Sequence, residues 1–362
     1  MNDYNGLTHL NGFYDSVFDW IKEFNLGSKF SSPNIKVINI NETIHLPKPK
    51  WDEYGPLRYK IRDPYVAIIE NGRIWGEKSF VITPNNKVLR DVMLPIRDIP
   101  SNEQLPPISH YYPETVATVG WWPEEDNVCL WFLEMLPRIY LLEKSGIPID
   151  KYVFGKLRHS YHHESLQKIG IPATKIIQVD NKKSHIKAKK LVITSIPRKL
   201  AGVPPKWTCE FVRNNILKRS DKKVLKEYER IYISREDKNT RTVINQGEVM
   251  NILDKYGFKK IVLAPLSLEK KINIFNSAKY IVAPHGAGLV HIAFCNPGTK
   301  ILEFSPKTYR NPVFGIMSHH TNLDYYRLIC DIEKPPRQHP GYDNIIVDTQ
   351  DFQKILDLWK IQ

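Results

Sequence analysis

Short apolar runs alternate with longer amphipathic segments along the second half of the chain. The short runs predict buried strands, and the segments between them predict helices with one apolar face. Ser267 precedes one of these helices and Gly257 follows another, which are typical signals for a helix start and a helix end. The predicted order is strand 231–234, helix 246–256, strand 260–264, helix 268–278, strand 280–283, helix 286–294 and strand 300–304. Such short connections favour right-handed crossovers and a parallel sheet.

The first half begins with β-rich runs at 36–40, 66–69 and 79–83. Asn71-Gly72 and Asn85-Asn86 separate these runs and are typical of hairpin turns, which predicts an antiparallel opening section. After a proline-rich loop the pattern becomes α/β alternation. Its predicted elements are strand 115–119, helix 127–144, strand 152–154, helix 164–169 and strand 175–179.

A chain of 362 residues is longer than one hydrophobic core normally supports, which predicts two domains. We expect a first domain over residues 1–205, a second, Rossmann-like domain over 206–345, and a C-terminal helix at 346–362, with packing back on the first domain as one candidate position. The fold class is α/β, with two Rossmann-like domains facing a cleft and an antiparallel section at the N-terminus. Ligands of open α/β sheets bind at the carboxyl ends of strands, so functional residues are expected in the turns that follow strands.

Composition bears on where in the cell the protein is expected. No run of about 18 apolar residues is present that would form a transmembrane helix. The first residues include Asp3, Asp15 and Asp19, where a secretory signal would have a basic and then an apolar run, so a cytoplasmic protein is predicted. The four cysteines are far apart in sequence and predict neither a zinc site nor a disulfide framework.

The formal net charge of +13 calls for an anionic partner or a lysine-rich solvated surface. A lysine cluster at 182–190 lacks the interleaved aromatic and arginine side chains that stack on bases and hydrogen-bond to them, so nucleic acid is disfavoured as a partner. Peripheral contact with an anionic membrane surface and binding of an acidic glycan both stay open.

The sharpest candidate site is the turn Ala283-Pro284-His285-Gly286-Ala287-Gly288-Leu289. Gly286, Ala287 and Gly288 carry little or no side chain where a helix is predicted to begin, so the unpaired N–H groups of the helix start are open to a diphosphate. His285 adds a donor for a phosphate oxygen or for the leaving group. The alternative is that the glycines serve close packing of helix on strand.

A second group of polar residues follows the predicted strand 231–234. Ser234 and Arg235 come at its end, and Arg241 and Asn245 precede the next helix. Arginine at a strand end is well suited to bidentate binding of phosphate. The alternative is a set of surface ion pairs with the neighbouring acids Glu236, Asp237 and Glu248.

Glu303 is predicted at the end of the strand 300–304, where a carboxylate can bind a ribose diol; the alternative is an exposed strand-end charge. No Asp-x-Asp pair is present, so we expect a site without metal, in which the helix start and the arginines neutralise the diphosphate.

The helix predicted at 127–144 is almost wholly apolar at its start, apart from Glu134 and Arg138, whose spacing of four places them on one face. A carboxylate in apolar surroundings suits a general base that takes a proton from a sugar hydroxyl. The alternatives are a buried ion pair between the two residues and a base among Glu124, Glu125 and Asp126. The aromatic residues Tyr111, Tyr112, Trp121 and Trp122 are candidates for stacking on sugars or for the core.

Several of these motifs, in this order, resemble glycosyltransferase family 61. The resemblance lies in Ile233-Ser234-Arg235, Arg241 to Asn245, Pro284 to Leu289 and Pro297 to Glu303, and more faintly in Trp131 to Arg138. It implies a GT-B fold and inverting transfer from a UDP-sugar, without a metal or other cofactor, to a glycan or glycan-phosphate acceptor held on the first domain. The sugar is left open among hexose, N-acetylhexosamine and pentose. Without an anchor, the chain looks like the soluble members that build capsule or surface polysaccharide.

One departure from the family pattern concerns the base. Relatives commonly carry histidine before the tryptophan of the first-domain motif, and this chain has Leu130. A non-catalytic protein that binds a glycan or nucleotide and keeps the fold is therefore the alternative function. An NAD-type enzyme is disfavoured because the glycine turn lacks the G-x-G-x-x-G spacing.

Overall fold

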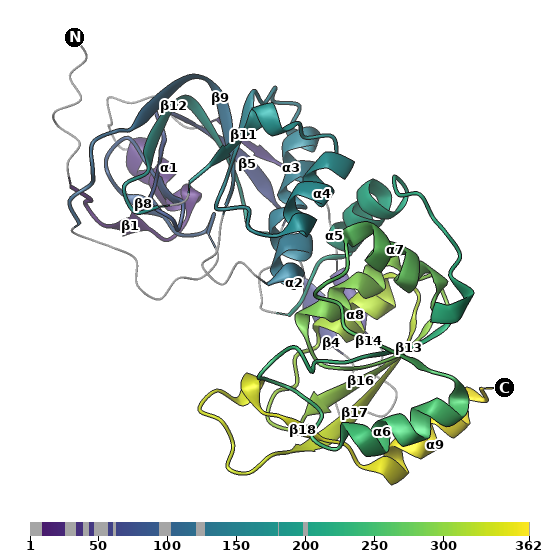
Figure 1. Cartoon of the computed structure of the whole chain (residues 1–362). Helices are drawn as coiled ribbons and strands as arrows, with labels where there is room; N and C mark the ends of the chain where they lie inside the picture. The colour runs from purple at the N-terminus through teal and green to yellow at the C-terminus, as the bar shows by residue number, and fades with distance from the viewer. Residues whose placement is uncertain are drawn as a thin grey trace. The chain divides into compact units, whose positions relative to one another are not determined.

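The computed structural model describes residues 9–25, 34–38, 43–46, 57–60, 63–93, 103–120, 127–179, 181–197 and 202–361 (Figure 1). The chain divides into two compact units. Unit 1 comprises Met1–Glu42 and Arg62–Lys199, and unit 2 comprises Thr43–Ile61 and Leu200–Gln362. Among the described helices, none is long and apolar enough to cross a membrane.

Unit 1 is built on one mixed sheet. Its parallel part consists of β9 (His110–Gly120), β10 (Lys151–Phe154), β11 (Ile176–Gln178) and β12 (His185–Thr194). These strands lie in the order β11-β10-β9-β12, so the chain starts in the middle and the direction of winding reverses between β9 and β12. The linking helices are α2 (Val128–Leu130), a π-helical turn η1 (Trp131–Met135), α3 (Arg138–Ser145) and α4 (Ser160–Lys168).

The antiparallel part of the same sheet contains β2 (Asn34–Val37), β5 (Tyr65–Glu70), β6 (Arg73–Trp75), β7 (Phe80–Ile82) and β8 (Val88–Leu89), with β1 (Phe13–Tyr14) beside β8 and helix α1 (Val17–Asn25) following β1. The hairpin predicted at Asn85-Asn86 is confirmed, since the Thr83 N–H donates to Lys87 O at 2.9 Å and Asn86 has a φ of 65°. The hairpin predicted at Asn71-Gly72 is wrong. Strands β5 and β6 both pair with β12, and the Asn71 N–H continues that ladder by donating to Lys189 O at 3.0 Å.

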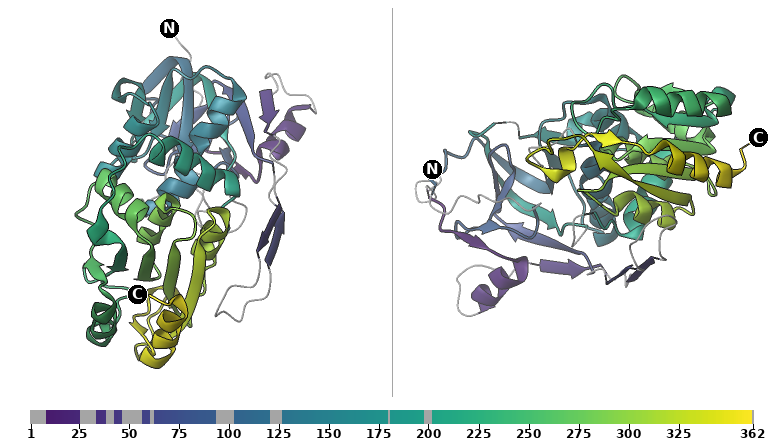
Figure 2. Two further views of the ribbon diagram at one scale, coloured as in Figure 1. Left: turned by 90° about the vertical axis from the view of Figure 1, so that its right-hand side faces the viewer. Right: turned by 90° about the horizontal axis from the view of Figure 1, so that it is seen from below.

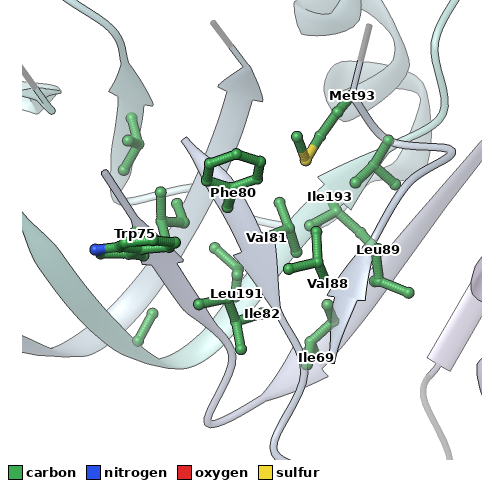
Figure 3. Close-up of a cluster of buried hydrophobic side chains, with 14 of the residues drawn as sticks. Ile69, Trp75, Phe80, Val81, Ile82, Val88, Leu89, Met93, Leu191 and Ile193 are labelled. Carbon is green, nitrogen blue, oxygen red and sulfur yellow. The ribbon is translucent and has the colours of Figure 1, made fainter. Parts of the chain in front are cut away.

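Strand β12 was not expected from the sequence, although it lies in the middle of the sheet. Its lysines, which the sequence indicated only as a basic cluster, alternate in part with the buried residues Ile186 and Ala188. Beyond them Leu191 and Ile193 enter the core of unit 1. Figure 3 shows these two side chains together with Ile69, Trp75, Phe80, Val81, Ile82, Val88, Leu89 and Met93.

Unit 2 contains a sheet in the order β14-β13-β15-β16-β17-β18. The strands are β13 (Arg230–Ile233), β14 (Lys259–Ile261), β15 (Tyr280–Pro284), β16 (Lys300–Pro306), β17 (Asp324–Ile332) and β18 (Ile345–Ile346). All pairs from β14 to β17 are parallel, which confirms the predicted parallel sheet, and β18 is antiparallel. The winding direction reverses between β13 and β15. A separate antiparallel pair is formed by β3 (Thr43–Leu46) and β4 (Leu57–Lys60).

Helices cover both faces of this sheet (Figures 1 and 2). On one face α6 (Gln246–Leu253) and α9 (Thr349–Trp359) enclose an apolar core with Val282, Leu302 and Phe304. On the other lie α7 (Leu268–Ser277), the 3₁₀ helix η6 (Ala287–Phe294) and α8 (Val313–His320), with α5 (Lys206–Val212) and the π-helical turn η3 (Arg213–Leu217) nearby. The short 3₁₀ turns η2 (Ala173–Lys175), η4 (Lys226–Tyr228), η5 (Asp254–Tyr256) and η7 (Pro340–Tyr342) complete the elements of the described residues.

Helix α9 packs in the core of unit 2, where Trp359 lies against Tyr280 and Tyr326. Two details differ from the sequence-based expectations for unit 2. The helix expected at 286–294 is a 3₁₀ helix. Helix α8 and strand β17 were not expected. The mixed α/β class is confirmed, and the facing of two domains across a cleft stays a prediction.

Candidate functional site

The reversal of strand order between β13 and β15 marks one edge of the unit 2 sheet as the place for a ligand. Connections leave the carboxyl ends of these two strands toward opposite faces, so the ends are not covered by a single crossover. Ser234 and Arg235 follow β13, and His285 and Gly286 follow β15. The two motifs that were sharpest in the sequence therefore meet at this edge.

Arg235 packs directly on Gly286. Gly286 has a φ of 179°, an extended conformation that any residue adopts, so its backbone does not require glycine. A Cβ atom at this position would instead collide with the guanidinium of Arg235, which explains the missing side chain. Arg235 is held in place because its Nε donates to Thr240 O at 3.1 Å. A cation thus lies beside the start of η6, whose first N–H groups have no partner within the helix.

Arg241 adds a second guanidinium to the same region. The pKa of Arg235 is lowered to about 10, mainly by burial and in addition by the nearby Arg241, while Asp237 acts in the opposite direction. Burial also lowers the pKa of Arg241, against the effect of Tyr309, Tyr342 and Glu303. The Nε of Arg241 is buried without a hydrogen bond. Two poorly compensated guanidinium groups side by side form a strong site for an anion.

His285 is hydrogen-bonded to Glu303 in the interior of unit 2. The distance from His285 Nδ1 to Glu303 Oε1 is 2.5 Å, and Glu303 Oε2 accepts a hydrogen bond from the Tyr325 hydroxyl at 2.6 Å. The histidine ring contacts the rings of Tyr309 and Phe314, with centroids 5.4 and 5.2 Å away. Burial raises the pKa of Glu303, but the attraction of His285, its hydrogen bond and Arg327 outweigh burial and lower it overall. Glu303 is therefore an ionised, buried partner of the histidine.

The geometry corrects the expectation for Glu303. The carboxylate lies in the middle of β16, is 0% exposed, and has both oxygens engaged by protein groups. It is neither an exposed strand-end charge nor accessible to a ribose diol, because it is fully buried and hydrogen-bonded to Tyr325 and His285. The sequence could not distinguish a strand end from a strand interior here, since β16 extends two residues beyond its predicted end.

Ser234 and Asn245 mainly support the turns. The Ser234 hydroxyl donates to Gln246 Oε1 at 2.8 Å, and the Asn245 side chain bonds both backbone groups of Val347, at 2.9 and 3.0 Å. At Gly288 a Cβ would come within 2.9 Å of Cδ1 of Leu263, the far end of a flexible side chain, so this position has little spare room.

The acids offered as surface partners of the arginines have other contacts. Glu236 pairs with Lys260 at 2.8 Å, and Glu248 accepts from Asn245 Nδ2 at 3.2 Å. Of the three acids named for that alternative, only Asp237 acts on Arg235 electrostatically. The surface ion-pair explanation therefore accounts poorly for the two arginines.

Glu134 and Arg138 lie in unit 1, both buried, with 2% and 1% of their surface exposed. Pro137 has no N–H to continue the α-helical pattern, and the Leu136 N–H bonds back to Trp131 O at 2.9 Å, which forms the π-helical turn η1. Burial lowers the pKa of Arg138 to about 10, and Glu134 acts in the opposite direction, so the two side chains interact electrostatically.

Arg138 also marks the point where the strand order of unit 1 reverses. Its Nη1 donates to Val92 O at 2.9 Å and lies against Gly120, where an added Cβ would be 2.8 Å away. Gly120 ends β9, the strand beside that reversal. The other candidates, Trp121, Trp122, Glu124, Glu125 and Asp126, lie outside the described residues.

The family model described as Glycosyltransferase 61 matches residues 130–302, just under half of the chain. A β-1,2-xylosyltransferase from Oryza sativa subsp. japonica is 31% identical over 67 residues, which are 18% of this chain and 13% of that protein. A β-1,2-xylosyltransferase from Arabidopsis thaliana is 30% identical over 67 residues, which are 18% of this chain and 12% of that protein. The chain thus matches only a small part of the length of these relatives.

Among solved structures, the bacterial iron-containing dodecameric glycosyltransferase TibC from enterotoxigenic E. coli aligns with 94% of this chain and 89% of its own. The sequence identity is 9% and the TM-score 0.28, a likeness too weak to bear on the fold.

Proposed function

We propose that this chain, whose residues 130–302 belong to the glycosyltransferase 61 family, moves a sugar from a nucleotide-diphosphate sugar to a hydroxyl group of a glycan. The observation that carries the proposal is the contact of Arg235 with Gly286 at the strand-order reversal of unit 2. Two guanidinium groups and a helix start converge there, and a diphosphate is the anion whose charge and size match them. The family resemblance of the motifs agrees with this reading, with UDP as the nucleotide.

The proposed reaction is a single displacement at the anomeric carbon with inversion. The acceptor oxygen forms the new bond to that carbon, the bond to the diphosphate oxygen breaks, and its electron pair leaves with the nucleoside diphosphate. Arg235 and Arg241 stabilise the charge that grows on the leaving group, and His285 supplies polar contact to it. The proton of the acceptor hydroxyl goes to a base, so atoms and charge balance without a cofactor.

Glu134 is the proposed base, on unit 1. It is 2% exposed, so it can serve only if the acceptor hydroxyl reaches it in the complex. Glu134→Gln should abolish transfer to an acceptor while keeping donor binding. Glu143→Gln, an exposed change on helix α3, is the matched control and should be silent. Unchanged transfer in Glu134→Gln would exclude this residue as the base.

The function is tested by incubating the purified chain with a panel of nucleotide sugars and measuring release of the free nucleotide. UDP-xylose enters the panel because both curated relatives are named xylosyltransferases. A slow release that disappears in Arg235→Ala supports the enzyme. Binding of a nucleotide sugar without release, in the presence of many glycan acceptors, would instead support a non-catalytic binding protein. Absence of both binding and release would refute the proposed site.

A further inference from the structure

Strands β16 and β17 carry a buried polar row on the face of the sheet opposite the α6/α9 core. Glu303 and Arg327 are in register, and Tyr325 precedes Arg327 by two residues and thus lies on the same face. The exposed fractions are 0% for Glu303, 2% for Arg327 and 9% for Tyr325. Their neighbours Leu302, Phe304, Tyr326 and Leu328 point into the apolar core with α6 and α9. The row therefore places buried polar side chains on one face of these strands, while the other face is apolar.

Hydrogen bonds link the row in one fixed direction. Arg327 Nε donates to the Tyr325 hydroxyl at 2.9 Å, and that hydroxyl donates to Glu303 Oε2 at 2.6 Å. A guanidinium can only donate and an ionised carboxylate can only accept, so the hydroxyl proton must point toward Glu303. The other carboxylate oxygen, Oε1, then accepts from Nδ1–H of His285 at 2.5 Å.

Helix α8 and the loop before it hold this row in place. Arg327 Nη2 donates to Asn311 O at 2.8 Å. A Cβ at Gly315 would be 3.1 Å from Cε1 of Tyr325, so the absence of a side chain on α8 makes room for the tyrosine ring. Burial and the adjacent Glu303 raise the pKa of Tyr325 well above its ordinary value, which keeps the hydroxyl a proton donor.

We propose that Arg327 and Tyr325 are positioning residues that keep Glu303 ionised and so hold a proton on Nδ1 of His285. Nε2 is then the ring nitrogen without a proton in the neutral ring, and it is the one that gains a proton when a diphosphate binds. Without the cation, a fully buried carboxylate takes up a proton, and the protonated acid donates to Nδ1 instead of accepting from it. This reversal would place the proton on Nε2. The inference rests on the proposed function for the role of Nε2, but the state of the ring is a separate physical claim.

The experiment reads the protonated ring nitrogen directly, by ¹⁵N NMR of the full chain labelled at histidine, with His285→Asn used to assign the signal. The wild type should show a proton on Nδ1. Arg327→Met and Glu303→Gln should move it wholly or partly to Nε2. Tyr325→Phe keeps the ring shape and removes one hydrogen bond to the carboxylate, so Glu303 should take up its proton, and the histidine proton should leave Nδ1, at a higher pH than in the wild type.

Tyr326→Phe is the matched control, because its hydroxyl donates to Asp324 at 3.1 Å and its ring lies on the other face of the sheet. It should leave the signal unchanged, and a shift equal to that of Tyr325→Phe would overturn the assignment to this row. An unchanged proton position in both Arg327→Met and Glu303→Gln, with native thermal unfolding, would overturn the proposal.

Donor hydrolysis supplies the second readout. Arg327→Met, Glu303→Gln and Tyr325→Phe should each lower kcat at least tenfold and change the donor KM by less than threefold, because they alter the state of His285 and leave Arg235 and Arg241 in place. If the wild type turns over no donor, the proposed function fails, while the NMR result still decides whether Arg327 and Tyr325 set the proton position.

Discussion

Arg235→Met should make the unliganded protein more stable and its donor binding weaker. Burial is the main cause that lowers the pKa of Arg235 to about 10, so the cation is disfavoured in the folded state by about 3 kcal/mol. The substitution also loses the hydrogen bond to Thr240 O, which is worth about 1 kcal/mol. The net expectation is a gain of about 1–2 kcal/mol in the free energy of unfolding, because methionine keeps most of the apolar stem.

Binding should change in the opposite direction. A charge-assisted hydrogen bond to phosphate contributes about 1.5–3 kcal/mol, so donor affinity should fall about 10- to 100-fold. At a concentration of about 100 times the wild-type Kd, the ligand adds about 2.7 kcal/mol to the wild type but only about 0.9 kcal/mol to a variant with about 30-fold weaker binding. The stability advantage of the unliganded variant should therefore shrink by about 1.8 kcal/mol when UDP-sugar is added.

Thermal unfolding with and without UDP-sugar measures both effects. Lys238→Met removes one positive charge from the same loop at a side chain that is 52% exposed, and it should change neither midpoint. A lower midpoint for unliganded Arg235→Met, together with an unchanged ligand-induced shift, would show that Arg235 is a packing residue and would refute the assignment of the diphosphate site.

Three further outcomes are expected. Gly286→Ala displaces the Arg235 guanidinium and should weaken donor binding about tenfold, whereas Gly247→Ala, on α6 with nothing within 4 Å of the new Cβ, should not, as isothermal calorimetry would show. Burial lowers the pKa of His291 to about 3, so between about pH 6.5 and that value only the unfolded state gains the proton. The free energy of unfolding, measured by chemical unfolding, should be about 2 kcal/mol lower at pH 5 than at pH 7, and His291→Gln should lack this loss. Phe352→Ala, at a 0% exposed ring packed edge-on to Phe304, should cost about 3–5 kcal/mol in the same assay and spare unit 1.

Hydrophobic periodicity was sufficient to predict an element where one of its faces is buried and its ends carry capping residues. Helix α7 begins after Ser267, whose side chain accepts from Lys270 N, and η5 ends at Gly257 with a φ of 68°. Strand β12 was missed because its lysines were interpreted as a charge cluster, while the strand pairs with neighbours on both sides and needs few apolar residues in that part. Strand β17 was missed although it alternates, because Tyr325 and Arg327 place polar groups on the buried face.

The alternating α/β elements of unit 2 and the order of its motifs, which resemble those of glycosyltransferase family 61, could be predicted from the sequence alone. Which of those motifs lie together depends on the strand order of the folded sheet. The strand order reverses between β13 and β15, and that reversal brings Arg235 onto Gly286 across 51 positions of sequence that a local pattern cannot span. The folded sheet also places Glu303 in the interior and not at the expected strand end, because the register of β16 with β17 buries the carboxylate beside Arg327 and Tyr325. Hydrophobic periodicity reports burial along one element, whereas the partner of a buried charge depends on which strands lie side by side.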